Sequence, residues 1–200
     1  ANEGLVTHNT GKSFYMALTM LHKAMTIPNY KVIVVAPQIK HTKILYDEVV
    51  NIIENNPYVE SNVSRYIQSP SPEVNFITGS FIRFFTAGTK SAGNADSARG
   101  QEADLIILDE MDYLHPDDLV ALLAMLQDTR KNKGKKILIG ASTPTGAHEV
   151  FYEWCTSPKS LFTEFYFPSY VNPEWSEEME QEMRGLYRTT NSYRHEIEAD

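Results

Sequence analysis

The sequence predicts an α/β fold with a mainly parallel central sheet flanked by helices. Three observations support this prediction: short apolar, β-branched runs recur along the chain, segments with helical periodicity separate them, and polar or Gly-containing segments lie between the two. A strand buried on both faces reads as a continuous apolar run, and strands that alternate with helices form parallel, doubly wound sheets.

The first half of the chain contains five of these elements. They are a helix over 14–25, a strand over 31–36, a helix over 39–55, and strands over 74–78 and 81–86. The first helix is apolar and free of Gly and Pro, and the strand over 31–36 is rich in Val and Ile. Gly79-Ser80 separates the last two strands, which predicts a β-hairpin with a two-residue turn.

The second half continues the alternation within a length that suits one domain. The expected elements are a loop over 87–100, a strand over 105–108, a helix over 116–127, strands over 136–140 and 162–167, and helices that begin near 172 and 192. His115 or Leu114 would cap the helix over 116–127. No internal repeat and no low-complexity tract interrupts this pattern.

Two adjacent carboxylates follow the most apolar of these strands, in the run ADLIILDE over 103–110. Ligands of α/β folds bind at the carboxyl ends of the strands, so Asp109 would emerge where it can hold Mg²⁺. Glu110 would lie beside it, where a carboxylate can orient or deprotonate an attacking water. The alternative is a buried strand followed by an ordinary acidic helix cap.

Thr10-Gly11-Lys12-Ser13 is the second half of the phosphate-binding loop G-x-x-x-x-G-K-[ST]. The Gly lets the backbone approach the phosphates, Lys12 supplies charge to the β- and γ-phosphates, and the Ser13 hydroxyl is a Mg²⁺ ligand. The first Gly of the pattern is missing, because position 6 is Val. Together with Asp109-Glu110, this loop predicts a P-loop NTPase of the RecA/ASCE-like type that uses ATP and Mg²⁺.

Two further segments are candidate parts of the same site. Ser142-Thr143 follows a strand expected beside the Asp109 strand, where hydroxyls can sense the γ-phosphate and couple its state to other elements. The alternative is a strand-end turn whose hydroxyls bond local backbone. Arg99 is a candidate arginine finger, supplied in cis or in trans by a neighbouring subunit. Its alternative is a surface Arg that anchors a loop or contacts DNA phosphate.

Composition excludes several classes of protein. The net charge of −8 argues against a surface that coats nucleic acid, although a local basic track is compatible with it. Cys155 is the only Cys, so an intramolecular disulfide and a four-Cys metal site are excluded. The six His residues show no ligand spacing, and we expect His41 and His115 at the surface or at helix caps. No apolar run is long enough to cross a membrane.

The chain resembles the ATPase domain of the large terminase subunit of tailed bacteriophages, the motor that packages DNA. The resemblance covers nearly all residues from Thr10 onward. The motifs that carry it are Thr10-Gly11-Lys12-Ser13, Val34-Val35-Ala36-Pro37, FITGS over 76–80, Ala98-Arg99-Gly100, IILDE over 106–110, Ser142-Thr143-Pro144, Asn172-Pro173 and YRHEI over 193–197.

This resemblance implies that ATP hydrolysis powers the translocation of double-stranded viral DNA into a procapsid. It implies a homo-oligomeric ring that works with a portal protein and a small terminase subunit, in the host cytoplasm at the procapsid portal. Arg99 and Glu110 would be catalytic, and Ser142 and Thr143 would couple hydrolysis to movement. In such terminases a nuclease domain follows this segment, so nuclease activity is not expected of these residues.

Residues 1–9 (ANEGLVTHN) depart from the family pattern, which places an Arg-containing segment before the Lys-Ser pair. They resemble the C-terminal end of an intein, which closes with an apolar stretch and His-Asn before a Cys, Ser or Thr. In this hypothesis Asn9 cyclises with help from His8, and residues 10–200 are the terminase-like ATPase domain. The alternative is a divergent start of the phosphate loop.

Two other functions fit parts of the sequence. A superfamily-2-like DNA-dependent ATPase or helicase shares a strand that ends in Asp-Glu and a Ser/Thr coupling motif, but a helicase needs a second RecA-like domain for which 200 residues leave no room. A non-hydrolysing assembly fragment is the alternative if the phosphate loop is incomplete. Binding of Mg-ATP distinguishes this fragment from the two enzymes.

Overall fold

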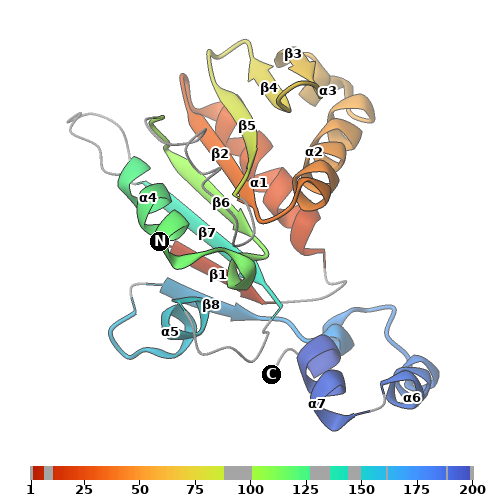
Figure 1. Cartoon of the computed structure of the whole chain (residues 1–200). Coiled ribbons are helices and arrows are strands. Elements are labelled where there is room, and N and C mark those ends of the chain that lie inside the picture. Colours follow the sequence, from red (N-terminus) through yellow and green to blue (C-terminus); the bar gives the residue numbers. More distant parts are fainter. Residues whose placement is uncertain are drawn as a thin grey trace.

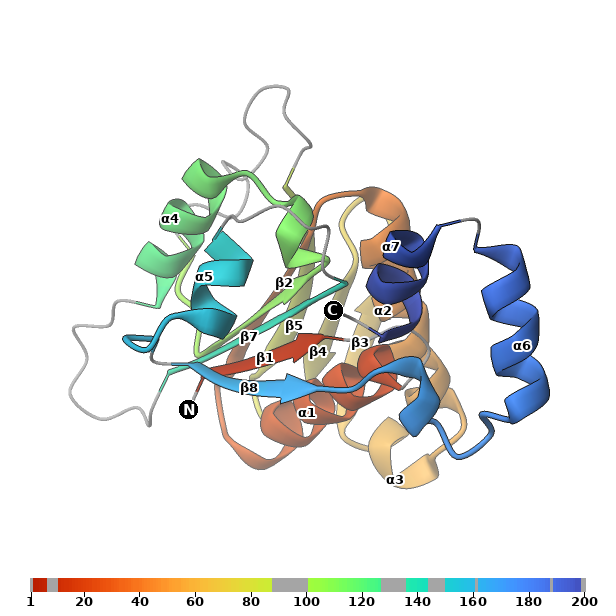
Figure 2. The same cartoon turned by 90° about the horizontal axis from the view of Figure 1, so that it is seen from below.

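An eight-stranded sheet forms the centre of the molecule, and helices cover both of its faces (Figures 1 and 2). The computed structural model describes residues 2–6, 11–87, 101–126, 136–143, 150–160, 162–187 and 189–198. The strands are β1 (Asn2–Val6), β2 (Lys31–Ala36), β3 (Val63–Ile67), β4 (Glu73–Phe76), β5 (Phe81–Thr86), β6 (Leu105–Asp109), β7 (Ile137–Ser142) and β8 (Phe162–Tyr166).

The helices alternate with these strands as the sequence predicts. They are α1 (Lys12–Thr26), α2 (Ile39–Glu54), α3 (Pro57–Glu60), α4 (Pro116–Met125), α5 (Val150–Thr156), α6 (Glu177–Leu186) and α7 (Thr190–Tyr193). Short 3₁₀ turns follow β6 (η2, Met111–Tyr113) and β8 (η3, Ser169–Val171), and a π-helical turn follows α7 (η4, Arg194–Glu198).

The strand order is β3-β4-β5-β2-β6-β7-β1-β8. The strands from β5 to β8 in this order run parallel, and β3 and β4 add an antiparallel margin beside β5. This arrangement confirms the predicted mainly parallel sheet. Because β2, β6 and β7 are parallel neighbours, the segments that leave them all emerge at one edge, which we call the carboxyl edge. The opposite margin is the amino edge.

Alternate residues of the central strands enter two separate cores. On β2, Val32 and Val34 pack toward α1 and α2, whereas Ile33 and Val35 pack toward α4 and α5. The same alternation on β6 explains the apolar run of its first four residues, since all five residues of the strand are buried. A strand covered on both faces has no position where a polar residue meets water.

The hairpin prediction is wrong in one detail. The connection between β4 and β5 spans 77–80 and is therefore four residues long, not two. Ser80, which was assigned to the turn, instead has a buried hydroxyl that accepts from the Tyr30 N–H at 2.9 Å and donates to the Ile27 carbonyl at 2.8 Å. These hydrogen bonds attach the four-residue loop to the segment that enters β2.

Four elements were not predicted: β1, β3, α3 and α5. β3 has a mixed polar sequence and exposed central residues, so no apolar periodicity marks it. α5 lies in an aromatic stretch of only seven helical residues. The helix expected to open at 172–175 begins later, at Glu177, where the Ser176 hydroxyl caps it by accepting from the Met179 N–H.

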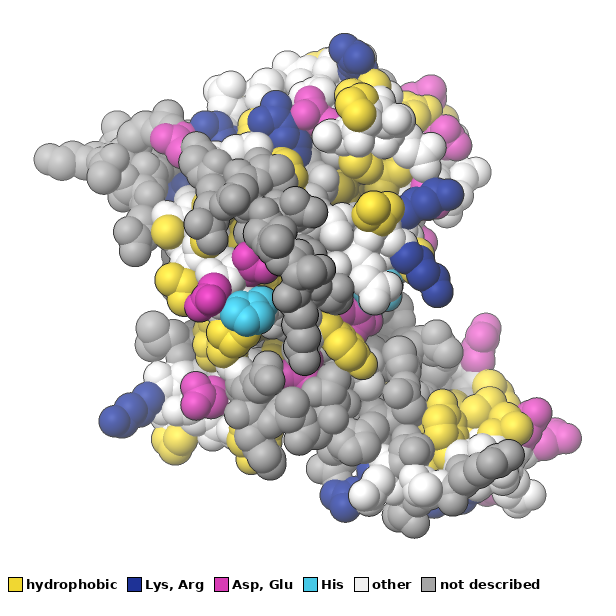
Figure 3. All heavy atoms as spheres, in the orientation of Figure 1, with side chains coloured by type: hydrophobic (Ala, Val, Ile, Leu, Met, Phe, Trp, Pro, Cys, Tyr) yellow, Lys and Arg dark blue, Asp and Glu magenta, His cyan; other side chains and the backbone are white. Residues whose placement is uncertain are grey.

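The acidic residues near the C-terminus lie on α6, which has no buried residue, and just before it at Glu174. Glu174, Glu177, Glu178 and Glu182 are exposed, as expected for a solvated helix face. On the face drawn in Figure 3, the described Lys and Arg side chains are scattered among acidic ones. Among the described residues, no helix is long and apolar enough to cross a membrane.

Candidate functional site

The phosphate-loop residues lie at the start of α1, at the carboxyl edge. Gly11 has φ +85°, a left-handed conformation that Gly adopts without strain, and it turns the chain into the helix at Lys12. The first N–H groups of a helix have no partner inside it, so this turn presents donors to an anion. Ser13 is half-buried in the same turn. Thr10 lies outside the described residues.

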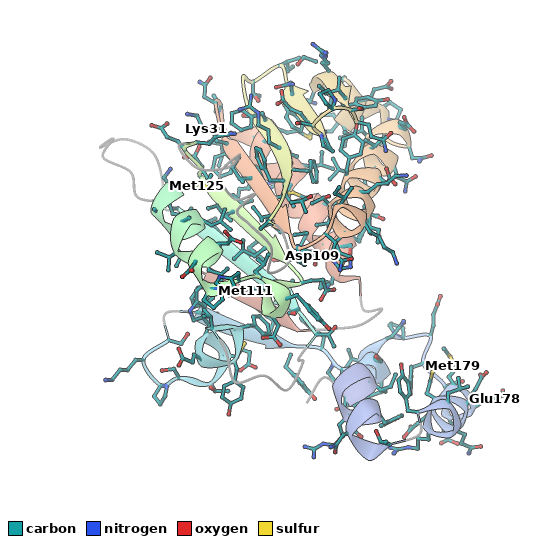
Figure 4. The ribbon with its side chains drawn as sticks, viewed as in Figure 1. Lys31, Asp109, Met111, Met125, Glu178 and Met179 are labelled. Atoms are coloured by element: carbon teal, nitrogen blue, oxygen red, sulfur yellow. The ribbon has the colours of Figure 1, made fainter. Side chains whose placement is uncertain are left out.

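Lys12 joins the phosphate loop to the two carboxylates. Its Nζ donates to Glu110 Oε1 at 3.0 Å and lies 3.5 Å from Asp109 Oδ1. The Lys12 side chain is only 10% exposed, so the ion pair is largely shielded from water. Asp109, labelled in Figure 4, stands at the end of β6 beside the segments that leave the neighbouring strands. Residues far apart in the sequence therefore form one charged cluster.

The backbone at Glu110 is strained. Its φ of 49° and ψ of 48° place a non-Gly residue in the left-handed region, which costs about 1–3 kcal/mol where it is not relieved. The turn is fixed by the Tyr113 N–H, which donates to the Glu110 carbonyl at 3.0 Å. This sharp reversal after β6 accompanies the contact of the Glu110 carboxylate with Lys12.

Asp109 is buried without full compensation. Burial raises the pKa of its carboxyl, the nearby Lys12 and His41 act to lower the pKa, and Glu110 raises it further. The Oδ1 atom is buried and has no hydrogen-bond partner among the described residues. A buried polar atom without a hydrogen bond is unusual, and here the Lys12 ammonium lies 3.5 Å from it. Mg²⁺ prefers oxygen ligands and keeps part of its water shell, so a carboxylate such as Asp109 suits this ion.

The predicted coupling residues lie at the end of β7, next to β6 in the sheet. Ser142 is fully buried, and its hydroxyl accepts from the Asp112 N–H at 3.2 Å and donates to the Thr143 carbonyl at 3.1 Å. The first of these bonds reaches η2, the turn that directly follows Glu110. Thr143 Oγ1 is buried without a hydrogen-bond partner among the described residues. The Ser142 hydroxyl therefore contacts the backbone of the turn after Glu110 and not the carboxylates.

Arg99 lies outside the described residues, as does the rest of the expected loop from residue 88 to 100. The expectation that His115 caps a helix is confirmed, since its Nδ1 accepts from the Asp117 N–H at 3.3 Å at the start of α4. Burial raises the pKa of the Cys155 thiol to about 11, which fits a packing role rather than a nucleophile. No cluster of three or more potential metal ligands occurs in the part of the chain that the structure describes.

His41 was expected at the surface or at a cap, but it lies close enough to Asp109 for its charge to act on the pKa of that carboxyl. It lies in the first turn of α2, is only partly exposed, and its Nδ1 is buried without a hydrogen-bond partner among the described residues. The signal that could have found it is its position just beyond the strand ending in Ala36-Pro37. That strand is the neighbour of β6, but its place in the sheet is not visible in a single sequence.

Comparison with known proteins decides the family. The family model described as terminase large subunit, T4likevirus-type, N-terminal, matches residues 8–197. The chain belongs to this family. The resemblance recognised from the motifs is thereby confirmed for the terminase large subunit. No curated protein matches this terminase chain.

Solved structures agree with this terminase assignment. The ATPase domain of the Thermus phage P74-26 large terminase is 21% identical, with a TM-score of 0.76 over 100% of this chain and 88% of that one. The large terminase of bacteriophage HK97 is 16% identical, with a TM-score of 0.77 over 100% of this chain and 46% of that one.

A third structure, the large terminase of a thermophilic bacteriophage in complex with ADP, is 13% identical, with a TM-score of 0.73 over 100% of this chain and 48% of that one. These identities are low, so the likeness concerns the fold: an α/β terminase ATPase domain. The terminase chain spans about half the length of the HK97 protein and of this ADP-bound terminase.

Proposed function

We propose that this terminase chain hydrolyses ATP to drive double-stranded viral DNA into a procapsid. The observation that carries the proposal is the contact of Lys12 Nζ with Glu110 at 3.0 Å and with Asp109 at 3.5 Å. A phosphate-loop Lys against a carboxylate pair at the carboxyl edge is the arrangement that nucleotide hydrolysis needs. The ADP-bound terminase of the thermophilic bacteriophage, which shares the fold, supports a nucleotide as the ligand.

Each residue of the cluster takes a role in this proposal. Lys12 and the N–H groups at the start of α1 bind the β- and γ-phosphates, with Thr10 and Gly11 completing the loop. Phosphate oxygens offer Lys12 an alternative partner, which releases the Glu110 carboxylate to orient and deprotonate the attacking water. Ser142 and Thr143 transmit the state of the site along β7.

The donor set fits Mg²⁺. Ser13 supplies a hydroxyl and Asp109 a buried carboxylate oxygen without a hydrogen-bond partner among the described residues. Mg²⁺ commonly keeps several waters and takes only one or two protein ligands beside the phosphates. When bound, the ion neutralises charge that develops on the phosphate oxygens. Its positive charge would also offset the unfavourable burial of the Asp109 carboxylate.

Substitutions of Glu110 and Lys12 test the proposal, and matched controls change the same residue types at exposed places. Glu110→Gln should lower turnover by about 10²–10⁴-fold while Mg-ATP binding persists, because the amide cannot accept the proton of water. Lys12→Ala should weaken Mg-ATP binding itself. Glu177→Gln on α6 and Lys43→Ala on α2 are exposed controls that should change neither quantity. Wild-type protein that fails to bind Mg-ATP would favour a non-hydrolysing assembly fragment.

The remaining parts of the proposal concern the assembled motor. The partners are double-stranded DNA, a portal protein, a small terminase subunit and further copies of the chain in a ring, at the procapsid portal in the host cytoplasm. Arg99 of one copy would complete the site of its neighbour. In that case specific activity rises with protein concentration. A constant specific activity, with Arg99→Ala still inactive, would favour a cis role.

Two interpretations fit residues 1–9: an intein remnant and a divergent start of the phosphate loop. The DNA sequence upstream of Ala1 decides between them. The family match begins at residue 8, so residues 1–7 lie outside it while His8 and Asn9 lie within it. The parallel pairing of β1 with β7 and β8 favours a divergent start of the phosphate loop, since the strand then leads into it. An ordinary terminase reading frame that runs directly into Ala1 would exclude the intein.

A further inference from the structure

An imidazole that the proposed phosphate and water chemistry does not use lies at the same site. His41 is in the first turn of α2, the helix that follows β2. β2 and β6 are parallel neighbours, with Val35 opposite Leu108, so the segments leaving the two strands emerge side by side. The topology therefore brings His41 to the same part of the carboxyl edge as Asp109.

Both side chains have a buried polar atom with no hydrogen-bond partner among the described residues. On His41 the atom is Nδ1, and on Asp109 it is Oδ1. Buried polar atoms are nearly always hydrogen-bonded, and each exception requires an explanation. A single interaction between these two atoms on adjacent segments would give each of them a hydrogen bond, beside the ion pair that Oδ1 already makes with Lys12 Nζ at 3.5 Å. A positive charge on His41 also acts to lower the pKa of Asp109, as expected for groups close in space.

Among the described residues, the groups around His41 leave its Nδ1 without a hydrogen bond, whereas Lys12 shares the Asp109 carboxylate at 3.5 Å. The His41 backbone N–H donates to the Gln38 carbonyl at 3.0 Å, which fixes the turn but leaves the ring available. The next residue, Thr42, donates its hydroxyl to the Ile39 carbonyl at 2.8 Å. Lys40 and Lys43 on the same helix are exposed. Lys12 makes its shorter contact with Glu110, so it leaves the Asp109 carboxylate only partly compensated.

We propose that His41 is a positioning residue for Asp109: an imidazole N–H donates to the Asp109 carboxylate, directly or through one water, and fixes the orientation in which Asp109 ligates Mg²⁺. The proposal rests on the proposed function for the metal, but the contact itself belongs to the protein alone. Ligating carboxylates are commonly held by such outer partners, whose loss typically lowers metal affinity or activity by about 10–100-fold.

The first experiment reads the contact without metal or nucleotide. The side-chain ¹⁵N resonances of the six His residues are recorded by NMR, and the signal lost in His41→Asn assigns His41. Asp109→Asn should shift the His41 resonances. Asp117→Asn is the matched control, because Asp117 Oδ2 lies 3.7 Å from His115 Nδ1 and its loss should shift His115 instead. A His41 signal unchanged by Asp109→Asn overturns the proposal.

The second experiment measures the Mg²⁺ requirement. His41→Ala should raise the Mg²⁺ concentration for half-maximal ATP turnover by about 10–100-fold, with Mg²⁺-free ATP binding unchanged. His41→Gln, which keeps an N–H donor, should restore part of the effect, and His22→Ala at an exposed position of α1 should have none. Wild-type protein without ATP binding would contradict the proposed function, whereas an active His41→Ala variant with the wild-type Mg²⁺ requirement would contradict this inference alone.

Discussion

Asp104 and Asp109 stand at the two ends of β6, and both are almost completely buried, with 4% and 5% of their surface exposed. At the amino edge, the Asp104 carboxylate accepts from the Lys31 N–H at 2.9 Å and from Lys136 Nζ at 3.0 Å. At the carboxyl edge, one Asp109 oxygen has no hydrogen-bond partner among the described residues, and burial raises the pKa of the carboxyl. The same residue type is thus satisfied by the protein at one end and left for another partner at the other.

Other polar groups at the amino edge are also hydrogen-bonded within the protein, as Asp104 is. The Ser80 hydroxyl bonds to backbone groups of the segment that enters β2, and the Thr78 hydroxyl donates to the Ala24 carbonyl at 2.8 Å. These bonds close the segments around the strand starts. At the carboxyl edge the backbone is strained at Glu110, and the carboxylates converge on a single Lys. Hydrogen bonds within the protein close the amino edge, and the charged cluster lies at the carboxyl edge.

The largest expected effect comes from the same substitution at the two aspartates. Asp104→Asn should lower the free energy of unfolding by about 3 kcal/mol, because it leaves the mostly buried Lys136 ammonium without its counter-charge. Asp109→Asn should leave the free energy of unfolding unchanged or raise it, and should abolish turnover. Urea unfolding at pH 7 and turnover per folded molecule check both. Equal losses of stability would remove the distinction between the edges.

The pH dependence of the Asp109 substitution has a defined sign. Folding raises the pKa of Asp109, so between its ordinary value of 3.8 and the raised value the folded state holds a proton that the unfolded state has lost. Stability then falls as the pH rises through this interval, and the destabilisation is complete above the folded pKa. In buffer without Mg²⁺ and nucleotide, any advantage of Asp109→Asn should therefore be larger at pH 7 than near pH 4.

These two aspartates also mark what a single sequence can reveal. Asp109 was recognised because its signal is local: an apolar strand followed directly by Asp-Glu. Asp104 begins the same run but gave no signal, because its partners Lys31 and Lys136 are 73 and 32 residues away. His41 was missed for the same reason, since its relation to Asp109 depends on the strand order β2-β6. Strand order is set by non-local pairing.

The fold class was predictable because it depends on periodicity within short segments. The parallel strands β2, β6 and β7 were found where both faces are buried, and β3 was missed where its residues are exposed. The sequence identified Lys12, Asp109 and Glu110 as parts of one site, and the structure brings them into contact. Their chemical roles stay predictions, as do those of Thr10 and Arg99, which lie outside the described residues.

The next expected effect compares two buried serines. Ser80→Ala should lower the free energy of unfolding by about 1–3 kcal/mol, since the Tyr30 N–H loses its acceptor in a buried place. Turnover per folded molecule should not change. Ser142→Ala should cost about 1 kcal/mol and also lower turnover, because its hydroxyl holds the Asp112 N–H in the turn after Glu110. Unfolding curves and turnover measured on both variants would contradict the comparison if Ser80→Ala impaired turnover as much as Ser142→Ala.

The smallest expected effect concerns left-handed backbone at the two edges. Gly79 has φ +77°, and a Cβ there would lie 2.6 Å from Asn29 Oδ1, so Gly79→Ala should lower the free energy of unfolding by about 1–2 kcal/mol. Gly185→Ala is the control, because it meets no atom within 4 Å in α6 and should stabilise the helix by a few tenths of a kcal/mol. Thermal unfolding should show opposite signs for the two variants.

If Gly79→Ala and Gly185→Ala shifted the unfolding temperature in the same direction, the loop over 77–80 would rearrange freely. The amino edge would then be less fixed than its hydrogen bonds indicate. Opposite signs would sharpen the contrast with Glu110, which adopts the same left-handed region with φ 49° and is not Gly. At the amino edge the left-handed positions are Gly79 and Asn29, two residue types that tolerate this conformation, whereas at the carboxyl edge Glu110 keeps the strain with a side chain that contacts Lys12. Backbone strain retained at a residue whose side chain reaches the charged cluster is what a functional carboxylate predicts and a structural turn does not.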